Sequence, residues 1–296
     1  MISVLQLGTV DYTTGLRLQQ QLVALRKEEK IGDVLLLLEH KPVITLGRNA
    51  KAANVLAPPE LLAQRGVELF ECDRGGDVTF HGPGQLVGYP IFDLRGYASE
   101  TADASSAVRQ SDNTRAPRKH LGAVDFVRRL EEVLIRTCAD FSLETKRIPG
   151  LTGVWTNADS PDAHVATAAS AVQRSEASAP AHTPEAKLAA IGIHISRFVT
   201  SHGFALNVNP DLTYFNLIIP CGITTKPVTS MQQELNKPLD LNAVAHSLSR
   251  NFGSVFASQI LWLENLDALL GKNLGVPMKP PENFRKLRDQ DDPAWA

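Results

Sequence analysis

The stretch Arg74–Gln85, RGGDVTFHGPGQ, lies between two runs that have the composition of β-strands, Val67–Cys72 and Leu86–Phe92. It contains four glycines and a proline around one histidine, His81. Glycine adopts positive φ readily and allows a backbone to approach a ligand closely. Because a structural turn needs far fewer special residues, the stretch predicts a functional loop between two strands of a sheet.

Strand-like patterns dominate the rest of the chain, and helical patterns do not alternate with them regularly. The predicted strands are Ile2–Val10, Asp33–Glu39, Pro42–Leu46, Val67–Cys72, Leu86–Phe92, Gly153–Thr156, Leu188–Arg197, His202–Val208 and Phe215–Ile219. The predicted helices are Thr14–Glu29, Pro59–Arg65, Leu121–Phe141 and Leu241–Ala257. This order predicts the α+β class, with helices that flank a mixed β-sheet.

Three segments show no periodic pattern, and each has a composition that buries little apolar surface. Residues 97–120 and 157–184 are rich in Ala, Ser, Asp and Pro, and residues 271–296 combine prolines with charges. Such compositions predict two flexible inserts and a loosely attached polar tail. Strand patterns resume directly after each insert, so we expect a single domain over residues 1–270.

The overall composition excludes several classes of protein. The chain has 296 residues, 43% of them hydrophobic, and a net charge of −2, which favours neither nucleic-acid binding nor membrane-surface binding. Its longest apolar run, Val34–Leu38, is far shorter than the roughly 18 residues of a membrane span. Three cysteines without a CxxC pair, and no signal peptide after Met1, predict a cytoplasmic protein with reduced thiols. Nothing in the sequence requires more than a monomer.

One of the three cysteines stands in a setting that suits chemistry. Cys221 lies between Pro220 and Gly222, after an apolar run that resembles a strand, so its thiol is expected at a turn. Cys72 and Cys138 lie inside apolar patterns that are typical of small core residues. Cys221 is therefore a candidate nucleophile, with a structural role as the alternative. A nucleophilic thiol needs a neighbour that ionises it.

Lys187 is the candidate neighbour. It begins the strand-like run Lys187–Ile193, 34 positions before Cys221, and an intervening hairpin would bring the two residues together. A lysine at the start of a strand is also commonly a solvated charge at the edge of a sheet. The sequence leaves both interpretations open.

Two histidines beside glycines, His81 and His202, allow further interpretations. Together with Cys221 and Asn207 they could form a cysteine-hydrolase site, or with the cysteine they could bind zinc. No short pair such as CxxC or HxxxH supports zinc, so we expect no metal. The glycine-rich stretch lacks the GxxxxGK[ST] pattern of a phosphate loop, and no helical pattern follows Gly84 as a dinucleotide fingerprint requires.

Five blocks of the sequence, taken in order, resemble the lipoyl (octanoyl) transferase family. They are RGGDVTFHGPGQLVGYP from Arg74, GVW at Gly153–Trp155, Lys187 with AAIG, HGFALN at His202–Asn207, and PCGI at Pro220–Ile223. The resemblance covers residues 5–257, and the first block is highly specific. The two inserts fall between the blocks and are longer than the family usually carries.

The resemblance implies both a fold and an activity. The family has the fold of the catalytic domains of biotin and lipoate protein ligases. Its enzymes are acyltransferases of lipoate biosynthesis: they move an octanoyl group from octanoyl-acyl carrier protein to a lysine of a lipoyl domain, through a cysteine thioester. The implied acceptors are the lipoyl domains of 2-oxoacid dehydrogenase complexes and the glycine cleavage H protein. A thioester already stores the energy for amide formation, so no cofactor is expected.

Carried over to this sequence, the family pattern assigns Cys221 as the acyl-accepting nucleophile and Lys187 as the partner that favours its thiolate and moves protons. It assigns the acyl pocket to Arg74, Gly75, Gly76, Asp77, Val78, Thr79, Phe80 and His81, to Ala190, Ile191 and Gly192, and to Gly203, Phe204 and Ala205. Once the thiol is acylated its negative charge is gone, so Lys187 can accept a proton from the incoming amine.

Two other functions fit part of the pattern. An ATP-dependent lipoate or biotin ligase shares the fold, but it activates a free acid as an adenylate and needs no cysteine nucleophile, so Cys221 argues against it. A non-catalytic acyl-binding protein would need neither Lys187 nor Cys221. A covalent octanoyl adduct that forms without ATP distinguishes the transferase from both.

Overall fold

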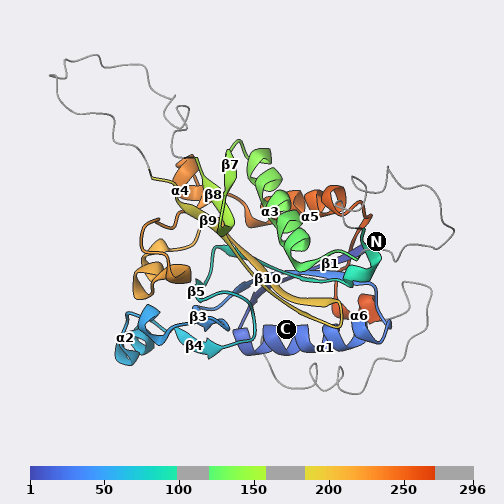
Figure 1. Cartoon of the computed structure of the whole chain (residues 1–296), viewed down its shortest axis with the longest axis horizontal. Helices are drawn as coiled ribbons and strands as arrows, with labels where there is room; N and C mark the ends of the chain where they lie inside the picture. Colours follow the sequence, from blue (N-terminus) through green and yellow to red (C-terminus); the bar gives the residue numbers. More distant parts are fainter. Residues whose placement is uncertain (99–119, 158–183, 271–296) are drawn as a thin grey trace, which may run out of the picture.

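The computed structural model describes residues 1–98, 120–157 and 184–270. These residues form two β-sheets, a large one of eight strands and a small one of three (Figure 1). In spatial order the large sheet consists of β11 (Ile260–Trp262), β1 (Ile2–Val10), β2 (Asp33–His40), β6 (Gln85–Ile91), β10 (Val199–Asn207), β9 (Lys187–Ser196), β8 (Leu151–Thr156) and β7 (Thr145–Ile148). The small sheet consists of β4 (Glu68–Glu71), β3 (Val43–Leu46) and β5 (Val78–His81).

The pairing of the strands makes the large sheet mixed. Strand β1 runs parallel to both of its neighbours, β2 and β11, whereas every other adjacent pair is antiparallel. The helices of the described residues are α1 (Tyr12–Lys27), α2 (Pro59–Gln64), α3 (Ala123–Asp140), α4 (Met231–Leu235), α5 (Leu241–Val255) and α6 (Leu266–Leu270). Helix α1 covers one face of the large sheet, and α3 and α5 pack together on the other (Figure 1). This arrangement confirms the predicted α+β fold.

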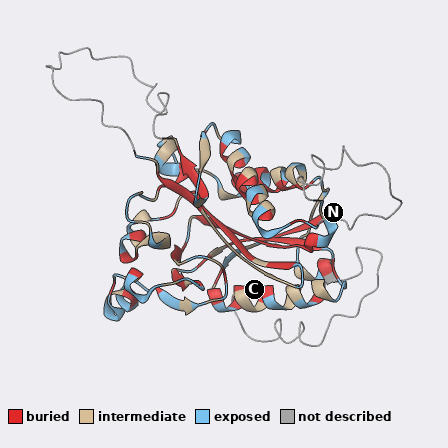
Figure 2. Ribbon diagram, viewed as in Figure 1, coloured by how far each residue is buried: buried red, intermediate tan, exposed pale blue. Residues whose placement is uncertain are grey.

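Strand β2 shows why both faces of the large sheet are covered. Its sequence, DVLLLLEH, is almost continuously apolar, and alternate side chains of a strand point to opposite faces. Leu35 and Leu37 join the apolar core beneath α3 and α5, while Leu36 and Leu38 join the core beneath α1. All four are at most 1% exposed, and the central strands of the sheet are largely buried (Figure 2).

Helix α1 begins two residues earlier than the apolar pattern predicts. The reason is Asp11, whose carboxylate accepts a hydrogen bond from the backbone N of Thr14 at 2.8 Å and caps the first turn. The spacing of its leucines predicts that Leu16, Leu18, Leu22 and Leu25 face inward; the last three are buried and Leu16 is half-buried. The helix therefore combines a local cap with the amphipathic stripe that the sequence predicts.

The prediction of a strand at Phe215–Ile219 is wrong. Most of this segment lies in a 3-10 helix, η4 (Leu212–Leu217). The side chain of Asp211 caps the start of that helix, and the Phe215 ring packs edge-on against Phe80 of β5, with 5.5 Å between the ring centroids. Packing against the small sheet, rather than pairing with another strand, therefore buries these apolar residues.

Several short elements were not predicted. The most important is β5, which lies inside the glycine-rich stretch where the sequence predicts only a loop. Its four residues, VTFH, pair with β3 in an antiparallel ladder. Strands β7 and β11 and helices α4 and α6 were not predicted either, and each has five residues or fewer. Patterns this short are weak against the background of irregular sequence.

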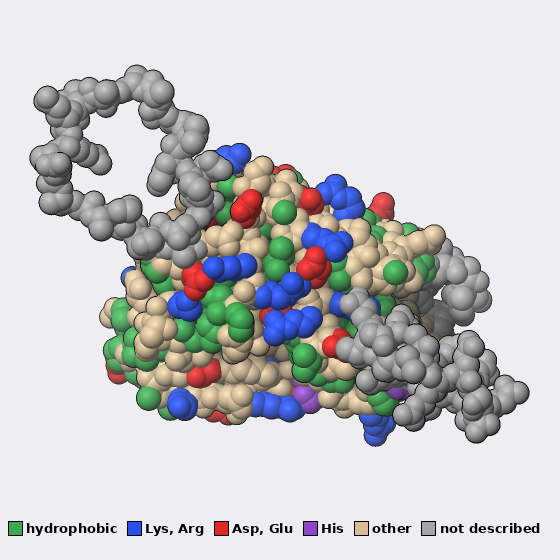
Figure 3. Space-filling view, turned by 45° about the horizontal axis from the view of Figure 1, so that its top comes forward, with side chains coloured by type: hydrophobic (Ala, Val, Ile, Leu, Met, Phe, Trp, Pro, Cys, Tyr) green, Lys and Arg blue, Asp and Glu red, His purple; other side chains and the backbone are tan. Residues whose placement is uncertain are grey.

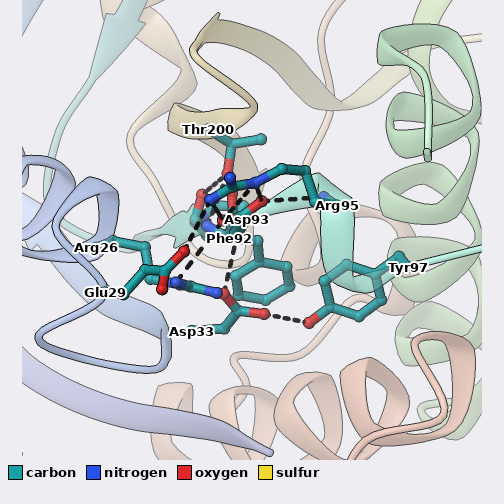
Figure 4. Close-up of polar contacts among 9 residues, drawn as sticks. Arg26, Glu29, Asp33, Phe92, Asp93, Arg95, Tyr97 and Thr200 are labelled. Carbon is teal, nitrogen blue, oxygen red and sulfur yellow. Dashed lines mark hydrogen bonds and ion pairs between the residues drawn. The ribbon is translucent and has the colours of Figure 1, made fainter.

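A buried carboxylate joins α1 to β2 and to the segment that follows β6 (Figure 4). Asp33, the first residue of β2, accepts hydrogen bonds from Arg26 Nε at 2.8 Å, from the backbone N of Asp93 at 2.9 Å and from the Tyr97 hydroxyl at 2.6 Å. Arg95 in turn pairs with the Asp93 carboxylate at 2.5 Å. One side chain thus joins the end of α1, the start of β2 and the segment that follows β6.

A second buried carboxylate, Glu131 of α3, fastens that helix to β8. It accepts hydrogen bonds from Arg128 at 2.6 Å, from Arg147 at 3.1 Å and from the backbone N of Gly153 at 3.1 Å. Glu131 thus joins α3 to β8. On the face drawn in Figure 3, Lys and Arg side chains lie among Asp and Glu, in keeping with the net charge of −2.

The predicted inserts at 97–120 and 157–184 fall almost entirely outside the described residues, and the predicted tail at 271–296 falls outside them completely. The described ends of each insert lie close together. Ala98 and His120 form an antiparallel bridge, and the backbone N of Thr156 donates to the carbonyl oxygen of Ala186 at 2.9 Å. None of the described helices combines the length with the apolar content that a membrane crossing requires.

Candidate active site

The glycine-rich stretch closes against strand β9. The backbone N of Gly75 donates to the carbonyl oxygen of Ile193 at 2.9 Å. A Cβ atom on Gly192 would lie 2.6 Å from the carbonyl oxygen of Gly75, closer than a side chain allows. Gly76 has a φ of 91°, in the left-handed region that favours glycine. Glycines are therefore needed on both sides of this contact, and the stretch becomes one wall of a pocket.

That pocket contains most of the residues that the family pattern assigns to acyl binding. Those on its wall are Arg74, Gly75, Gly76, Asp77, Thr79, His81, Ala190, Ile191, Gly192, Gly203, Phe204 and Ala205. Val78 and Phe80 do not line it, because alternation along β5 turns their side chains into the apolar core of the small sheet. The wall also contains Tyr12, Val87, Tyr89, His202 and Cys221.

Arg74 brings a buried positive charge to the pocket. It is 8% exposed, and its guanidinium donates to the carbonyl oxygen of Thr45 at 2.7 Å, to the Thr45 hydroxyl at 2.9 Å and to the carbonyl oxygen of Gly75 at 3.1 Å. All of these acceptors are neutral. The charge is therefore held in place without being neutralised by them, and its field acts on the pocket.

Lys187 and Cys221 come together at one end of the pocket, although 34 positions separate them in the sequence. Nζ of Lys187 lies 3.1 Å from Sγ of Cys221. Lys187 is 7% exposed, so the alternative of a solvated charge at a sheet edge is wrong. The Trp155 ring of β8 lies 5.2 Å from Nζ, in cation–π contact. The side-chain nitrogen of Lys187 is therefore within hydrogen-bond distance of the Cys221 thiol.

The turn that carries Cys221 is supported by Asp77. Cys221 has a φ of 57°, which is uncommon for a residue other than glycine, within the short 3-10 turn η5 (Pro220–Gly222). The Asp77 carboxylate accepts a hydrogen bond from the side chain of Asn54 at 2.5 Å. A Cβ atom on Gly222 would lie 2.8 Å from that carboxylate. Asn54 in turn accepts a hydrogen bond from the backbone N of Ile219 at 2.7 Å, so Asp77 acts on the turn through Asn54, in addition to lining the pocket.

A smaller hollow adjoins the pocket and shows which end of it carries the thiol. The residues that line both are Thr79, Ala190, Ala205 and Cys221. The hollow is also lined by Lys187, Gln85 and Asn207, whereas Tyr12 and Tyr89 line only the pocket. The two tyrosines therefore lie toward the end of the pocket away from Lys187.

At that far end, His40 and Tyr89 form a buried polar pair that the sequence analysis missed. Nδ1 of His40 lies 2.8 Å from the carbonyl oxygen of Val10, and Nε2 lies 2.6 Å from the Tyr89 hydroxyl. Because a carbonyl only accepts, Nδ1 carries the proton and the hydroxyl donates to Nε2. Burial lowers the pKa of His40 to about 4, so the ring is neutral near pH 7. The available signal was a histidine at the end of an apolar strand.

The two histidines considered for a hydrolase site have other partners. Nδ1 of His81 lies 2.7 Å from the side-chain oxygen of Gln85, and burial lowers the pKa of His81 to about 3. Nε2 of His202 lies 2.7 Å from the Asp73 carboxylate. In the part of the chain that the structure describes, the hydrogen bond to Cys221 comes from Lys187 and from neither imidazole. Nor do three His, Cys, Asp or Glu side chains gather there as a metal site needs.

Comparison with known proteins identifies the family. The chain matches the model of the lipoyl protein ligase A/B catalytic domain over residues 11–110 and 114–253. The octanoyltransferase of Koribacter versatilis (strain Ellin345) is 53% identical over 291 residues, 98% of this chain and 98% of the relative. That of Acidobacterium capsulatum is 50% identical over 272 residues, 91% of this chain and 96% of the relative. The chain belongs to the octanoyltransferase family. It is accordingly an acyltransferase.

Solved structures outside the octanoyltransferase family share its fold. A bi-partite lipoate protein ligase from Thermoplasma acidophilum has a TM-score of 0.59 at 14% identity, over 99% of this chain and 94% of that one. Lipoate-protein ligase A bound with ATP has a TM-score of 0.58 at 13% identity, over 98% of this chain and 94% of that one. At such low identity the likeness concerns the fold alone, and it confirms the expected ligase-like catalytic domain.

The other two cysteines of this octanoyltransferase-family chain lie in settings that do not favour reaction. Cys138 is fully buried in the core beneath α3, where desolvation raises the pKa of its thiol to about 12. Cys72 is half-buried, and its thiol donates to the carbonyl oxygen of Leu46 at 3.4 Å. Cys221 thus differs from both, because a lysine ammonium faces its sulfur.

Proposed function

We propose that this enzyme transfers an octanoyl group from octanoyl-acyl carrier protein to a lysine of a lipoyl domain, through a thioester on Cys221. The observation that carries the proposal is the 3.1 Å contact between Lys187 Nζ and Cys221 Sγ at the end of a pocket. The name of the relatives, octanoyltransferase, supplies the acyl group. The pocket residues of the glycine-rich stretch and of strands β9 and β10 would hold the acyl chain.

In the first half-reaction, the Cys221 thiolate attacks the carbonyl carbon of the donor thioester. The bond from that carbon to the donor sulfur breaks, and the departing thiolate takes a proton from the Lys187 ammonium. The products are octanoyl-Cys221, a free thiol on the carrier and a neutral Lys187 amine. The exchange of one thioester for another is nearly balanced in energy, so it requires no ATP.

In the second half-reaction, the amine of the acceptor lysine attacks octanoyl-Cys221. Neutral Lys187 takes the proton that the amine loses, and Cys221 leaves as a thiolate. An amide has formed, and the ammonium–thiolate pair has been restored. The acylated cysteine carries no charge, so nothing opposes the neutral state of Lys187 between the two steps.

The proposal extends to partners and setting. The acceptors would be the lipoyl domains of 2-oxoacid dehydrogenase complexes and the glycine cleavage H protein, and the enzyme would work as a cytoplasmic monomer without a cofactor. A mechanism that depends on a free thiolate suits a reducing compartment, and all three cysteines are unpaired. Residues 1–270 would form the catalytic domain, with the two inserts and the tail as accessory segments.

Intact-mass measurement after incubation with octanoyl-acyl carrier protein, without ATP or a metal, tests the proposal. We expect a mass increase of one octanoyl group that maps to the Cys221 peptide and disappears when a lipoyl domain is added. An adduct that required free octanoate and ATP would instead indicate a ligase. Bound octanoate without a covalent adduct would indicate an acyl-binding protein.

A further inference from the structure

Two buried amides beside the Lys187–Cys221 pair have their orientations dictated by backbone carbonyls. Gln85 is 2% exposed and Asn207 is 4% exposed. The Gln85 side chain lies 3.2 Å from the carbonyl oxygen of Phe80, and that of Asn207 lies 2.9 Å from the carbonyl oxygen of Thr229. A carbonyl oxygen only accepts, so each amide must direct its NH2 group there. Gln85 then donates to the side-chain oxygen of Asn207 at 2.8 Å.

These orientations determine which atom carries the proton in each bond of a longer chain of hydrogen bonds. The side-chain oxygen of Gln85 faces Nδ1 of His81 at 2.7 Å, so this nitrogen must carry the proton. Nε2 of His81 is then an acceptor, and the Thr45 hydroxyl, 3.4 Å away, donates to it. The Thr45 oxygen in turn accepts from the Arg74 guanidinium at 2.9 Å. Every link from Arg74 to Asn207 donates in the same direction.

The other end of the chain reaches the backbone of Lys187. Strand β10 ends at Asn207, and beyond it residues 227–229 take its place beside β9. The backbone N of Lys187 donates to Pro227 O at 2.8 Å, and that of Thr229 donates to Lys187 O at 3.0 Å. The hydrogen-bond chain ends at the Thr229 carbonyl oxygen, and the Thr229 hydroxyl separately donates to the Glu234 carboxylate at 2.5 Å. The chain thus starts at the Arg74 guanidinium and ends at a carbonyl of the segment that is hydrogen bonded to the backbone of Lys187.

We propose that Gln85, Asn207 and Thr229 are positioning residues that hold the Lys187 ammonium against the Cys221 sulfur, an inference that rests on the proposed role of that pair. The Asn207 side chain, at the end of β10, is hydrogen bonded to residues 227–229. These residues are in turn hydrogen bonded to the backbone of Lys187. Gln85 and Asn207 also line the hollow that Lys187 and Cys221 share. The Gln85 amide donates to two acceptors and the Asn207 amide donates to the Thr229 carbonyl, so exchange of either amide for a carboxylate removes a donor that nothing replaces.

The test is the rate of Cys221 alkylation by iodoacetamide as a function of pH, in variants of the full chain. Lys187→Met removes the cation, so its alkylation profile should differ from that of wild type by the largest amount. Asn207→Asp keeps the side-chain volume but loses the donor to the Thr229 carbonyl. We expect its profile to shift toward that of Lys187→Met, with a several-fold lower rate at pH 7 and a lower kcat. A profile displaced by one pH unit corresponds to about a tenfold change in that rate.

Two further variants keep the test decisive. Thr229→Val retains the backbone bonds to Lys187 and deletes one hydroxyl, so it should fold and shift the profile in the same direction by less. Ser247→Ala is the matched control: it removes a buried 2.5 Å hydrogen bond to Asp140, between α5 and α3, and should lower thermal stability without moving the profile.

The outcomes separate this inference from the proposed function. If wild type and Lys187→Met have the same alkylation profile, Lys187 does not act on Cys221. The proposed function and the positioning role are then both wrong. If these two differ while Thr229→Val and any folded Asn207→Asp match wild type, the pair stands and the positioning role is overturned. A shift in Ser247→Ala as large as that in Asn207→Asp would also overturn it.

Discussion

At the scale of single residues, the three cysteines show how setting determines reactivity. Cys138 is surrounded by apolar side chains, and Cys72 donates to a backbone carbonyl. Cys221 alone among them has a lysine ammonium at hydrogen-bond distance, in the described structure. Burial in the apolar core raises the pKa of the Cys138 thiol to about 12, so this thiol stays protonated near neutral pH.

Substitution of each cysteine should have a different effect on the transfer of the octanoyl group to a lipoyl domain. Cys221→Ser should lower the transfer rate by at least about 10³-fold, because a serine hydroxyl does not ionise near neutral pH and the covalent step is lost. Cys72→Ser and Cys138→Ser are the controls. They should keep the wild-type rate per folded molecule, with a lower melting temperature for Cys138→Ser because it buries a hydroxyl in an apolar core. Transfer by Cys221→Ser at the rate of these controls would exclude the thioester.

At the scale of elements, the pocket exists because the glycine-rich stretch and β9 approach each other through backbone atoms. Gly75 donates to Ile193, and Gly192 faces the carbonyl oxygen of Gly75 without a side chain between them. The motif therefore combines a strand, β5, whose ladder orients Thr79 and His81 toward the pocket, with a glycine segment that fits against a second sheet. Neither element forms the site alone.

The substitution Gly192→Ala should push the glycine-rich stretch away from β9. The added methyl would lie 2.6 Å from a backbone oxygen, which cannot rotate away as a side chain can, so the stretch must move. We expect a loss of about 1–3 kcal/mol in the free energy of unfolding and a higher KM for the acyl donor. Urea unfolding and steady-state kinetics measure the two effects. Gly32→Ala, where a Cβ atom meets nothing within 4 Å, is the matched control and should change neither.

At the scale of the whole molecule, buried neutral histidines make stability depend on pH. His40 accepts a proton near pH 6.5 when unfolded, but burial lowers its pKa in the folded protein to about 4. The unfolded state therefore binds more protons below pH 6.5. The contribution of neutral His40 to the unfolding free energy is fully present above pH 6.5 and is lost as pH falls toward 4.

Urea unfolding at pH 7 and pH 4 measures this effect. Between these pH values, wild type should lose about 3 kcal/mol more of its unfolding free energy than His40→Gln, which cannot titrate at this position. His81, whose pKa burial lowers to about 3, is present in both proteins and cancels in the comparison. Equal losses in the two proteins would mean that His40 is not held neutral by burial.

The second insert offers a prediction about the chain as a whole. Residues 159–182 contain few large apolar side chains, and the described ends meet at Thr156 and Ala186, which are hydrogen bonded at 2.9 Å. A short Gly/Ser linker can therefore close the gap, and the cost of loop closure changes only logarithmically with length. Replacement of Asp159–His182 by such a linker should leave the melting temperature within a few degrees of wild type. A larger drop would show that the insert packs against the domain.

The sequence by itself determined the features that depend on local patterns and residue types. Continuous apolar runs such as Val34–Leu38 identify buried strands, and the spacing of leucines identifies α1. The ordered motifs identify the family and single out Cys221 and Lys187 as candidates. These properties are visible because each depends on neighbours within a few positions.

Only the tertiary structure decided what depends on residues far apart in the chain. The strand-like composition of Phe215–Ile219 gives way to a 3-10 helix because Phe215 packs on Phe80, which is 135 positions away. The sequence left open whether Lys187 is an edge charge, and the contacts of Trp155 and Cys221 bury it instead. The orientation of Asn207 depends on a carbonyl of a segment that no periodicity predicts. Such contacts follow from the pairing of the whole sheet, since local sequence does not specify which distant residue will be the neighbour.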